Sequence, residues 1–255
     1  MRTLAFAKRN LKELLRDPLS YIFCLGFPLV MLVVMTAINS IIPENAGLTI
    51  FQIKSLTPGI AVFGLSFIML FATLSVSKDR SGAFLTRLFS SPMTAFDFIA
   101  GYLLPLIVMS VGQLVICFLA GGLIGAIDGE SFDALGALAS AASLLPCALF
   151  FIGVGILFGT LFGEKSAPPC SSIIISLCGM LGGIWFDVGM RPDDNVFGIV
   201  CRVLPFSHSV DLARSLYVGN AQDLAAHLTV SAAWAIGVFA LSVLTFSLKM
   251  RSDKK

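Results

Sequence analysis

Charged residues are scarce in this chain. Aspartate, glutamate, lysine and arginine together make up 13% of the 255 residues, against about 25% in a soluble domain, and 57% of the residues are hydrophobic. This balance excludes an ordinary soluble protein and indicates an integral membrane protein. The formal net charge of +2 also excludes the strongly basic surface that nucleic-acid binding requires, so we expect no nucleic-acid partner.

Residue types that carry out catalysis or bind metals are equally rare. The chain has only two histidines, His208 and His227, and it has neither an H-E-x-x-H nor a G-x-S-x-G motif. The six cysteines form no C-x-x-C pair, and the Gly-Glu-Lys-Ser stretch at 163–166 lacks the spacing of a phosphate-binding loop. The sequence therefore predicts no catalytic residue, no metal and no cofactor in this chain.

Long apolar runs make up much of the chain. A helix needs about 20 apolar residues to cross a bilayer, and six runs reach or approach that length: 19–42, 57–77, 98–127, 134–162, 171–186 and 224–248. A shorter piece at 196–206, interrupted by Arg202 and Pro205, predicts a re-entrant or interfacial element within the extracellular segment 187–223. We predict one all-α transmembrane domain over residues 1–255, with six membrane-spanning helices.

The positions of lysine and arginine predict the orientation of these spans. If both termini lie on one side, that side collects most of the cations, and the opposite side carries most of the acidic residues. Cytoplasmic segments carry an excess of lysine and arginine. We therefore predict a multi-pass protein of the cell membrane with both termini in the cytoplasm.

Residues 1–18 predict an amphipathic helix at the cytoplasmic interface, ended by Pro18. Its apolar face would carry Leu4, Ala7, Leu11, Leu14 and Leu15, and its polar face Lys8, Arg9, Lys12, Glu13 and Arg16. Two interpretations remain open and are compatible. The helix is a membrane anchor whose basic residues meet anionic lipid, or it also forms part of a docking surface for a cytoplasmic protein.

The loop between the second and third spans, residues 78–97, predicts a short cytoplasmic helix. Asp79 or Ser81 can cap it, and Pro92 prevents its continuation. An apolar face turned away from lipid suits contact with another protein. That predicted face consists of Phe84, Leu85, Leu88 and Phe89.

Two further patterns lie in the second half of the chain. Gly155, Gly159 and Gly163 have the four-residue spacing of a close helix contact, within one subunit by preference over a contact between two. His208, Asp211 and Arg214 are spaced three apart and can meet on one helix face. For this polar cluster we favour a structural ion pair over a role in lining a transport path.

Three segments resemble one protein family. They are the basic amphipathic start of the chain, KDRSGAFLTRLFSSPMTAFDFIAGYLLP after the second span, and LPFSHSVDLARSLYVGN before the last. In this order they resemble the membrane-spanning subunits of type 2 ABC exporters, a family that includes drug, antibiotic, polysaccharide and teichoic-acid export permeases. Many relatives carry glutamates before the glycine at position 82, where this chain has Lys78 and Arg80 around Asp79.

The resemblance implies partners and roles for these residues. It implies a second membrane subunit, expected to be a copy of this chain, and two separate cytoplasmic ATPase subunits that bind ATP and Mg²⁺. The loop after the second span would be the coupling helix, and residues 1–18 the interface helix that braces it. The coupling residues would be Asp79, Arg80, Gly82, Phe84, Leu85, Leu88, Phe89 and Pro92, and the interface residues Lys8, Leu11 and Leu15.

Two other classes of function remain as alternatives. A stand-alone secondary transporter or channel commonly has an inverted repeat or ionisable residues within its spans, and these spans have almost none. A membrane-embedded enzyme needs converging polar side chains, and only the cluster His208, Asp211 and Arg214 approaches that. For the exporter, the apolar spans and the resemblance favour a hydrophobic or amphipathic substrate over a polysaccharide.

Overall fold

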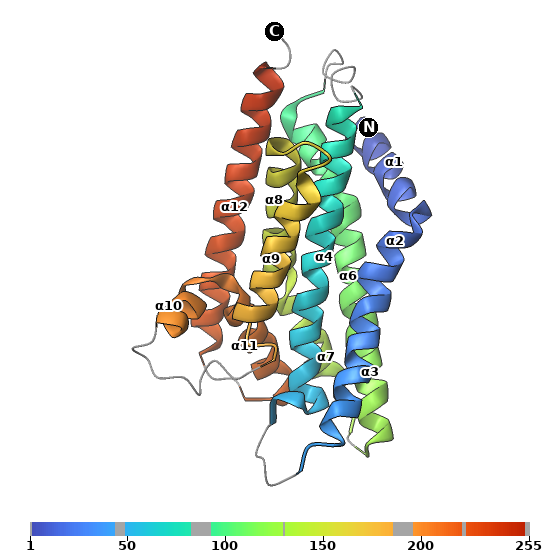
Figure 1. Ribbon diagram of the computed structural model, residues 1–255, viewed down its shortest axis with the longest axis vertical. Helices are drawn as coiled ribbons and strands as arrows, with labels where there is room; N and C mark the ends of the chain where they lie inside the picture. Colours follow the sequence, from blue (N-terminus) through green and yellow to red (C-terminus); the bar gives the residue numbers. More distant parts are fainter. Residues whose placement is uncertain are drawn as a thin grey trace.

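The chain folds into an elongated helical bundle, with the start of α1 and the end of α12 at the same end (Figure 1). The computed structural model describes residues 2–43, 49–82, 93–129, 131–185, 196–220 and 223–252, and no strand occurs in these ranges. The elements are α1 (Arg2–Arg16), α2 (Pro18–Tyr21), the π-helical η1 (Ile22–Gly26), α3 (Phe27–Asn39), the 3₁₀ turn η3 (Thr49–Phe51), α4 (Ile53–Ser81), α6 (Ala95–Ile127), α7 (Ala134–Ser143), α8 (Leu145–Leu161), α9 (Ala167–Leu181), α10 (Val196–Val203), α11 (Pro205–Val218) and α12 (Leu224–Ser252).

Within the described ranges, five segments are long and apolar enough to cross a membrane. They are Pro18–Asn39, Ile53–Ser81, Ala95–Ile127, Ala134–Leu161 and Leu224–Met250. Each corresponds to one of the predicted apolar runs, so the prediction of an all-α membrane protein is confirmed. The first segment follows directly on α1, because α1 ends at Arg16 and Asp17 caps the helix that begins at Pro18.

The predicted fifth span differs from the others. Its helix, α9, has 15 residues, which corresponds to about 22 Å at 1.5 Å per residue and falls short of the roughly 30 Å of a bilayer core. After it, α10 and α11 meet at a bend of 72°, the geometry of a broken span or a re-entrant loop. Together α9, α10 and α11 carry the chain back to the end opposite the termini (Figure 1).

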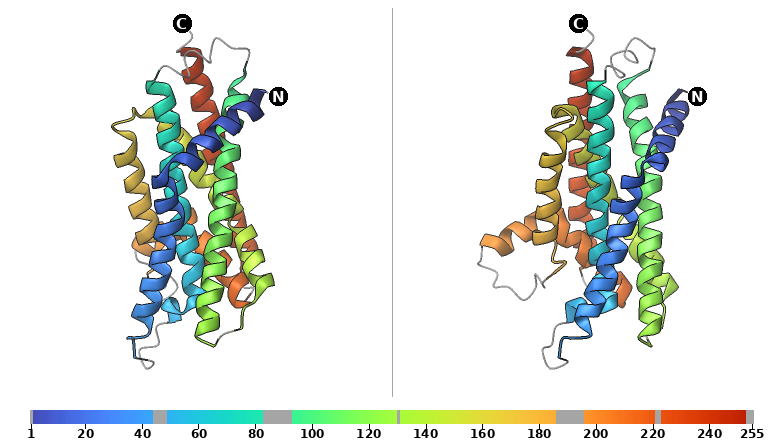
Figure 2. Two further views of the ribbon diagram at one scale, coloured as in Figure 1. Left: turned by 90° about the vertical axis from the view of Figure 1, so that its right-hand side faces the viewer. Right: turned by 45° about the vertical axis from the view of Figure 1, so that its right-hand side comes forward.

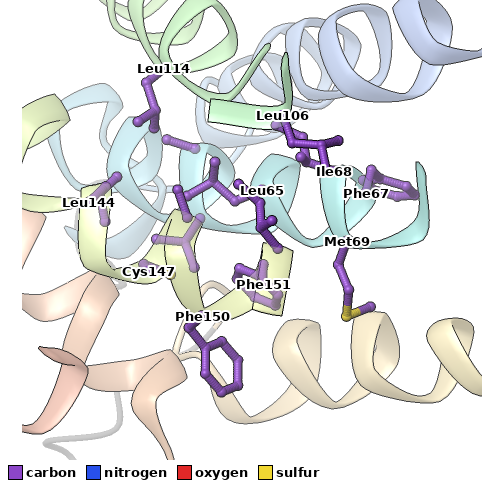
Figure 3. Packing of buried hydrophobic residues seen from close by; sticks show 14 of the residues in the cluster. Leu65, Phe67, Ile68, Met69, Leu106, Leu114, Leu144, Cys147, Phe150 and Phe151 are labelled. Carbon is purple, nitrogen blue, oxygen red and sulfur yellow. The ribbon is translucent and has the colours of Figure 1, made fainter. Parts of the chain in front are cut away.

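The centre of the bundle is α4, which packs against α3, α6, α8, α9 and α11. Apolar side chains lie on all sides of it. A helix that other helices enclose has no stripe that faces solvent or lipid. Figure 3 shows this core from close by, with labelled residues from α4, α6 and α8: Leu65, Phe67, Ile68 and Met69, then Leu106 and Leu114, then Cys147, Phe150 and Phe151. By contrast, the first and last spans bury little of their surface within this chain.

Two of the three regularly spaced glycines lie at the closest contact in the bundle, between α4 and α8. A Cβ atom at Gly155 would lie 2.6 Å from the carbonyl oxygen of Met69, and one at Gly159 would lie 2.8 Å from that of Thr73. These glycines therefore let two helix backbones approach within one subunit, as predicted. The prediction is wrong for Gly163. A Cβ atom there would have no neighbour within 4 Å, because Gly163 lies beyond the end of α8.

Candidate functional site

The last turn of α4, just before residues 83–92, carries a buried carboxylate. Asp79 is 6% exposed, and its two oxygens accept hydrogen bonds of 2.9 Å from the two terminal nitrogens of Arg9 on α1. The hydroxyl of Tyr102 on α6 donates a third hydrogen bond, of 2.8 Å, to the same carboxylate. A buried carboxylate is tolerated when it is paired with a positive charge and its oxygens accept hydrogen bonds. Asp79 thus joins three helices at one point.

The position of α1 depends on its contact with α6, and Figure 2 shows the two helices side by side. Phe6 packs edge-to-face on Phe98 and Tyr102, with ring centroids 5.7 Å and 5.1 Å apart. A Cβ atom at Gly101 would collide with the ring of Phe6, so only glycine fits there without a shift. Asn10 is buried beside them and donates a hydrogen bond to the carbonyl of Gly101.

The start of α6, just after residues 83–92, is also tied to α1. Thr94 and Asp97 form a capping box, in which each side chain bonds the backbone N–H of the other residue. The hydroxyl of Thr3 on α1 donates a hydrogen bond of 2.5 Å to the carboxylate of Asp97. Arg9 binds α4, which precedes residues 83–92, and Thr3 binds α6, which follows them. Helix α1 therefore bridges both flanks of this segment.

The same end of α4 contacts the end of α8. Arg80 donates a hydrogen bond to the carbonyl of Thr160, and the hydroxyl of Ser81 donates one of 2.9 Å to the carboxylate of Glu164. Successive residues therefore connect α4 to different neighbours: Asp79 to α1 and α6, Arg80 to α8, and Ser81 to the turn before α9. We call Arg9, Asp79, Arg80, Asp97 and Tyr102, with these contacts, the coupling junction, after the coupling helix that the family resemblance implies for the loop at residues 78–97.

Exposed charges surround the junction on α1. Glu13 pairs with Arg9 at 2.9 Å and with Lys78 at 3.2 Å. Solvent-exposed pairs of this kind contribute little to stability, about 0–1 kcal/mol. The hydrogen bond to Asp79 raises the pKa of the Arg9 guanidinium above its ordinary value, which already keeps an arginine charged at physiological pH.

The predicted apolar face of the interface helix is divided between two surroundings. Leu14 and Ala7 are buried in the bundle, whereas Leu4 is 68% and Leu15 46% exposed, and these two stay predicted contacts with the membrane. Leu11 is partly buried and Lys8 is exposed. The side that packs on the protein instead includes Phe6, Asn10 and the head of Arg9. The apolar residues of α1 can face either the protein or the membrane, and a hydrophobic stripe in the sequence does not show which residues face which.

Several junction residues were not identified from the sequence. Thr3, Asn10, Asp97 and Tyr102 lie within helices whose apolar pattern hides their polar contacts. One available signal was Pro105, which cannot donate to the carbonyl four residues earlier and so leaves an acceptor at Gly101. Of the predicted coupling residues, Gly82 caps α4, whereas Phe84, Leu85, Leu88, Phe89 and Pro92 lie outside the described residues.

The predicted polar cluster lies at the other end of the bundle and is divided between two contacts. Arg214 on α11 donates hydrogen bonds to the carbonyls of Ser55, at 2.8 Å, and Gly183, at 3.0 Å, and it pairs with Asp211 at 3.7 Å. These bonds tie α11 to the start of α4 and to the turn after α9, which supports the structural interpretation of this pair. His208 lies apart from the pair and contacts His227 on α12.

A comparison with protein families matches residues 1–218 to the ABC-2 type transporter family. The chain belongs to this family. A comparison with curated proteins finds no match. The ABC-2 match includes α1, both flanks of residues 83–92 and the whole of α11, so it contains the complete coupling junction. Membership establishes an ABC transporter permease, a multi-pass membrane protein of a family that is not itself catalytic.

Proposed function

We propose that this chain is the membrane-spanning subunit of an ATP-driven exporter and that the loop at residues 78–97 contains its coupling helix. Two copies would enclose the translocation path, and each would dock one separate ATPase subunit on the cytoplasmic side of the cell membrane, where both termini would also lie. ATP and Mg²⁺ would bind to the ATPase subunits. The family match and the coupling junction support this proposal.

The main support for the proposal is the position of α1, which binds the helices on both sides of residues 83–92. The helix before residues 83–92 is held through Arg9 and Asp79, and the helix after them through Thr3 and Asp97. Interior packing is dense and transmits displacement because it has little free volume. A push on the coupling helix therefore reaches α1, α4 and α6 as one unit, and it reaches α8 through Arg80.

An aromatic cluster on one side of α4 supports a hydrophobic or amphipathic substrate, such as a drug, an antibiotic or a lipid-like compound. An aromatic stack runs along this side, with neighbouring ring centroids 5.2–6.0 Å apart; its members are Phe23, Phe27, Phe63, Phe67 and Trp185. Toward the end that holds the termini, a cavity of about 230 Å³ follows, lined by Leu14, Phe71 and Leu74 together with Lys78 and the acidic side chains of Glu13, Asp17, Asp79 and Glu164. Apolar rings followed by charged side chains of both signs suit a molecule with an apolar body and a polar end.

The test of coupling uses the permease expressed with its ATPase. Leu88→Asp and Phe84→Asp place a charge on the predicted docking face, and each large apolar side chain buried there would contribute about 1.5–3 kcal/mol. We expect both variants to insert into the membrane but to lose co-purification with the ATPase and the stimulated ATP hydrolysis.

The matched control is Ile41→Asp, which places the same charge on a residue 80% exposed at the opposite end of the bundle. It should leave coupling intact. Full ATPase stimulation in both loop variants would contradict the docking assignment. Substrate flux driven by a proton or sodium gradient through the purified chain alone would instead establish a stand-alone secondary transporter or channel. The molecular mass of the purified permease in lipid nanodiscs tests the homodimer.

A further inference from the structure

The two histidines of this chain, 19 positions apart, contact each other. The Nδ1 atom of His208 on α11 lies 2.8 Å from the Nδ1 atom of His227 on α12, and their ring centroids are 5.1 Å apart. The contact lies where α11 meets the base of α12, at the end of the bundle opposite the termini (Figure 1). The pair takes no part in the coupling junction, and His227 lies beyond the residues matched to the family.

The surroundings of His208 determine which ring nitrogens carry protons. Its Nε2 atom lies 2.7 Å from the carbonyl oxygen of Arg202 on α10. A carbonyl only accepts, so Nε2 of His208 must carry the proton, and the Nδ1 atom of the neutral ring is then an acceptor. While His208 is neutral, His227 must therefore donate from its Nδ1 atom. If His208 is itself protonated, it can donate from Nδ1 to a neutral His227, so the contact is lost only when both rings are protonated.

We propose that the His208–His227 pair is a proton-controlled latch that holds the re-entrant helix α11 against α12. Histidine is the side chain whose charge ordinarily changes between about pH 5 and 8. When both rings are protonated, two N–H donors and two positive charges face each other across this short contact. The hydrogen bond is then lost and the rings separate.

The charged groups around the pair are compatible with this release. On α11, Asp211 and Arg214 lie one and two turns after His208, and Asp223, just before α12, lies one turn before His227. Arg202 on α10 lies beside them through its backbone carbonyl. His227, Asp211, Arg214 and Asp223 all line one cavity of about 380 Å³. Because Arg214 pairs with Asp211, the two carboxylates and this guanidinium together leave a net negative charge in the cavity for a protonated His227 to turn toward.

Two neighbouring contacts lack a titratable group. The hydroxyls of Ser209 on α11 and Ser231 on α12 share a hydrogen bond of 3.2 Å, and the indole N–H of Trp234 on α12 donates one of 2.8 Å to the carbonyl of Val203 on α10. These bonds are unaffected by a change from pH 8 to 5.5. Release of the latch therefore loosens the His208 end of α11 and opens the polar cavity, while the remaining contacts retain the helix.

The first experiment uses the unaltered full-length chain in lipid nanodiscs, purified without a histidine tag and labelled with ¹⁵N-histidine. Because the chain has two histidines, the spectrum contains two rings, which His227→Gln assigns. At pH 8 we expect His208 as the Nε2–H tautomer, with a coupling between the two Nδ1 nuclei across the hydrogen bond. This coupling should disappear as the pH falls to 5.5. Two rings that titrate independently, without a coupling at pH 8, would overturn the proposal.

The second experiment measures hydrogen exchange of α11 at pH 8 and 5.5, with labelling times scaled to the intrinsic exchange rate. We expect about threefold to tenfold faster exchange at pH 5.5, which is the effect of losing one hydrogen bond. In His227→Gln we expect no difference in exchange between the two pH values, because glutamine does not titrate. The control Ser231→Ala removes an uncharged hydrogen bond between the same helices and should keep the pH difference. A pH difference that survives in His227→Gln, or that is absent in the unaltered chain, would overturn the proposal.

Discussion

The side-chain amide of Asn10 donates a hydrogen bond of 3.1 Å to the carbonyl oxygen of Gly101. Pro105 lies one helical turn later in α6 and has no N–H to donate to that carbonyl. The acceptor that proline leaves in α6 is thus satisfied by α1, a separate helix. In an apolar environment an unsatisfied carbonyl is costly, so this bond fixes the register in which α1 lies on α6 and, with it, the geometry of the coupling junction.

Gly101→Ala should displace α1 from α6. The added methyl group would collide with the ring of Phe6, and overpacking of this kind costs about 1–3 kcal/mol. Gly112→Ala on the same helix is the matched control, because a Cβ atom there has nothing within 4 Å. Thermal unfolding in detergent measures both. The double variant Phe6→Leu/Gly101→Ala should recover part of the loss, and equal stability of the two single variants would contradict the contact.

Arg9→Gln should leave the carboxylate of Asp79 buried without its cationic partner. Loss of one member of a buried ion pair costs about 3–5 kcal/mol, and we expect about 1–3 kcal/mol because Arg9 is itself partly exposed. Lys12→Gln, an exposed residue one turn away, serves as the control. The free energy of unfolding and the stimulated ATPase activity should both fall in Arg9→Gln. Unchanged values for both would show that the ion pair is dispensable.

Tyr102→Phe removes one hydrogen bond to Asp79 and keeps the ring that packs on Phe6. Hydrogen bonds to charged groups contribute about 1.5–3 kcal/mol, so the variant should unfold at a lower temperature. Tyr21→Phe removes a hydroxyl whose partner, the carbonyl of Leu15, is exposed. That change should have little effect. If the two variants unfold alike, the hydroxyl of Tyr102 has no special role in the junction.

Gly159→Ala should separate α4 from α8, because its Cβ atom would lie 2.8 Å from the carbonyl oxygen of Thr73 and 2.6 Å from the Cβ atom of Val76. We expect a loss of about 1–3 kcal/mol or more, since backbone cannot move aside as a flexible side chain does. Gly163→Ala, one helical turn later, meets no neighbour and should be tolerated. Folding yield and thermal stability measure the difference. Equal tolerance of alanine at both positions would refute the close approach.

Part of the site was predictable because it depends on local patterns. The apolar runs predicted the spans, and the spacing of Asp211 and Arg214 predicted their ion pair, since residues three apart on a helix are neighbours whatever lies around them. The family resemblance predicts a coupling role for Asp79, but nothing in the sequence predicts its contacts with Arg9 and Tyr102, because these residues are 70 and 23 positions away in the chain. Nothing in the local pattern around Tyr102 distinguishes it from an ordinary apolar helix position.

The sequence by itself determined that this is an all-α membrane protein with an amphipathic first helix, because hydrophobicity and helical periodicity are properties of consecutive residues. Tertiary packing decides which side of α1 faces the protein, which glycines join α4 to α8, and that His208 on α11 contacts His227 on α12. These outcomes depend on which helices become neighbours. Packing between segments far apart in the chain decides which helices become neighbours. Each residue contributes only a small part of that packing.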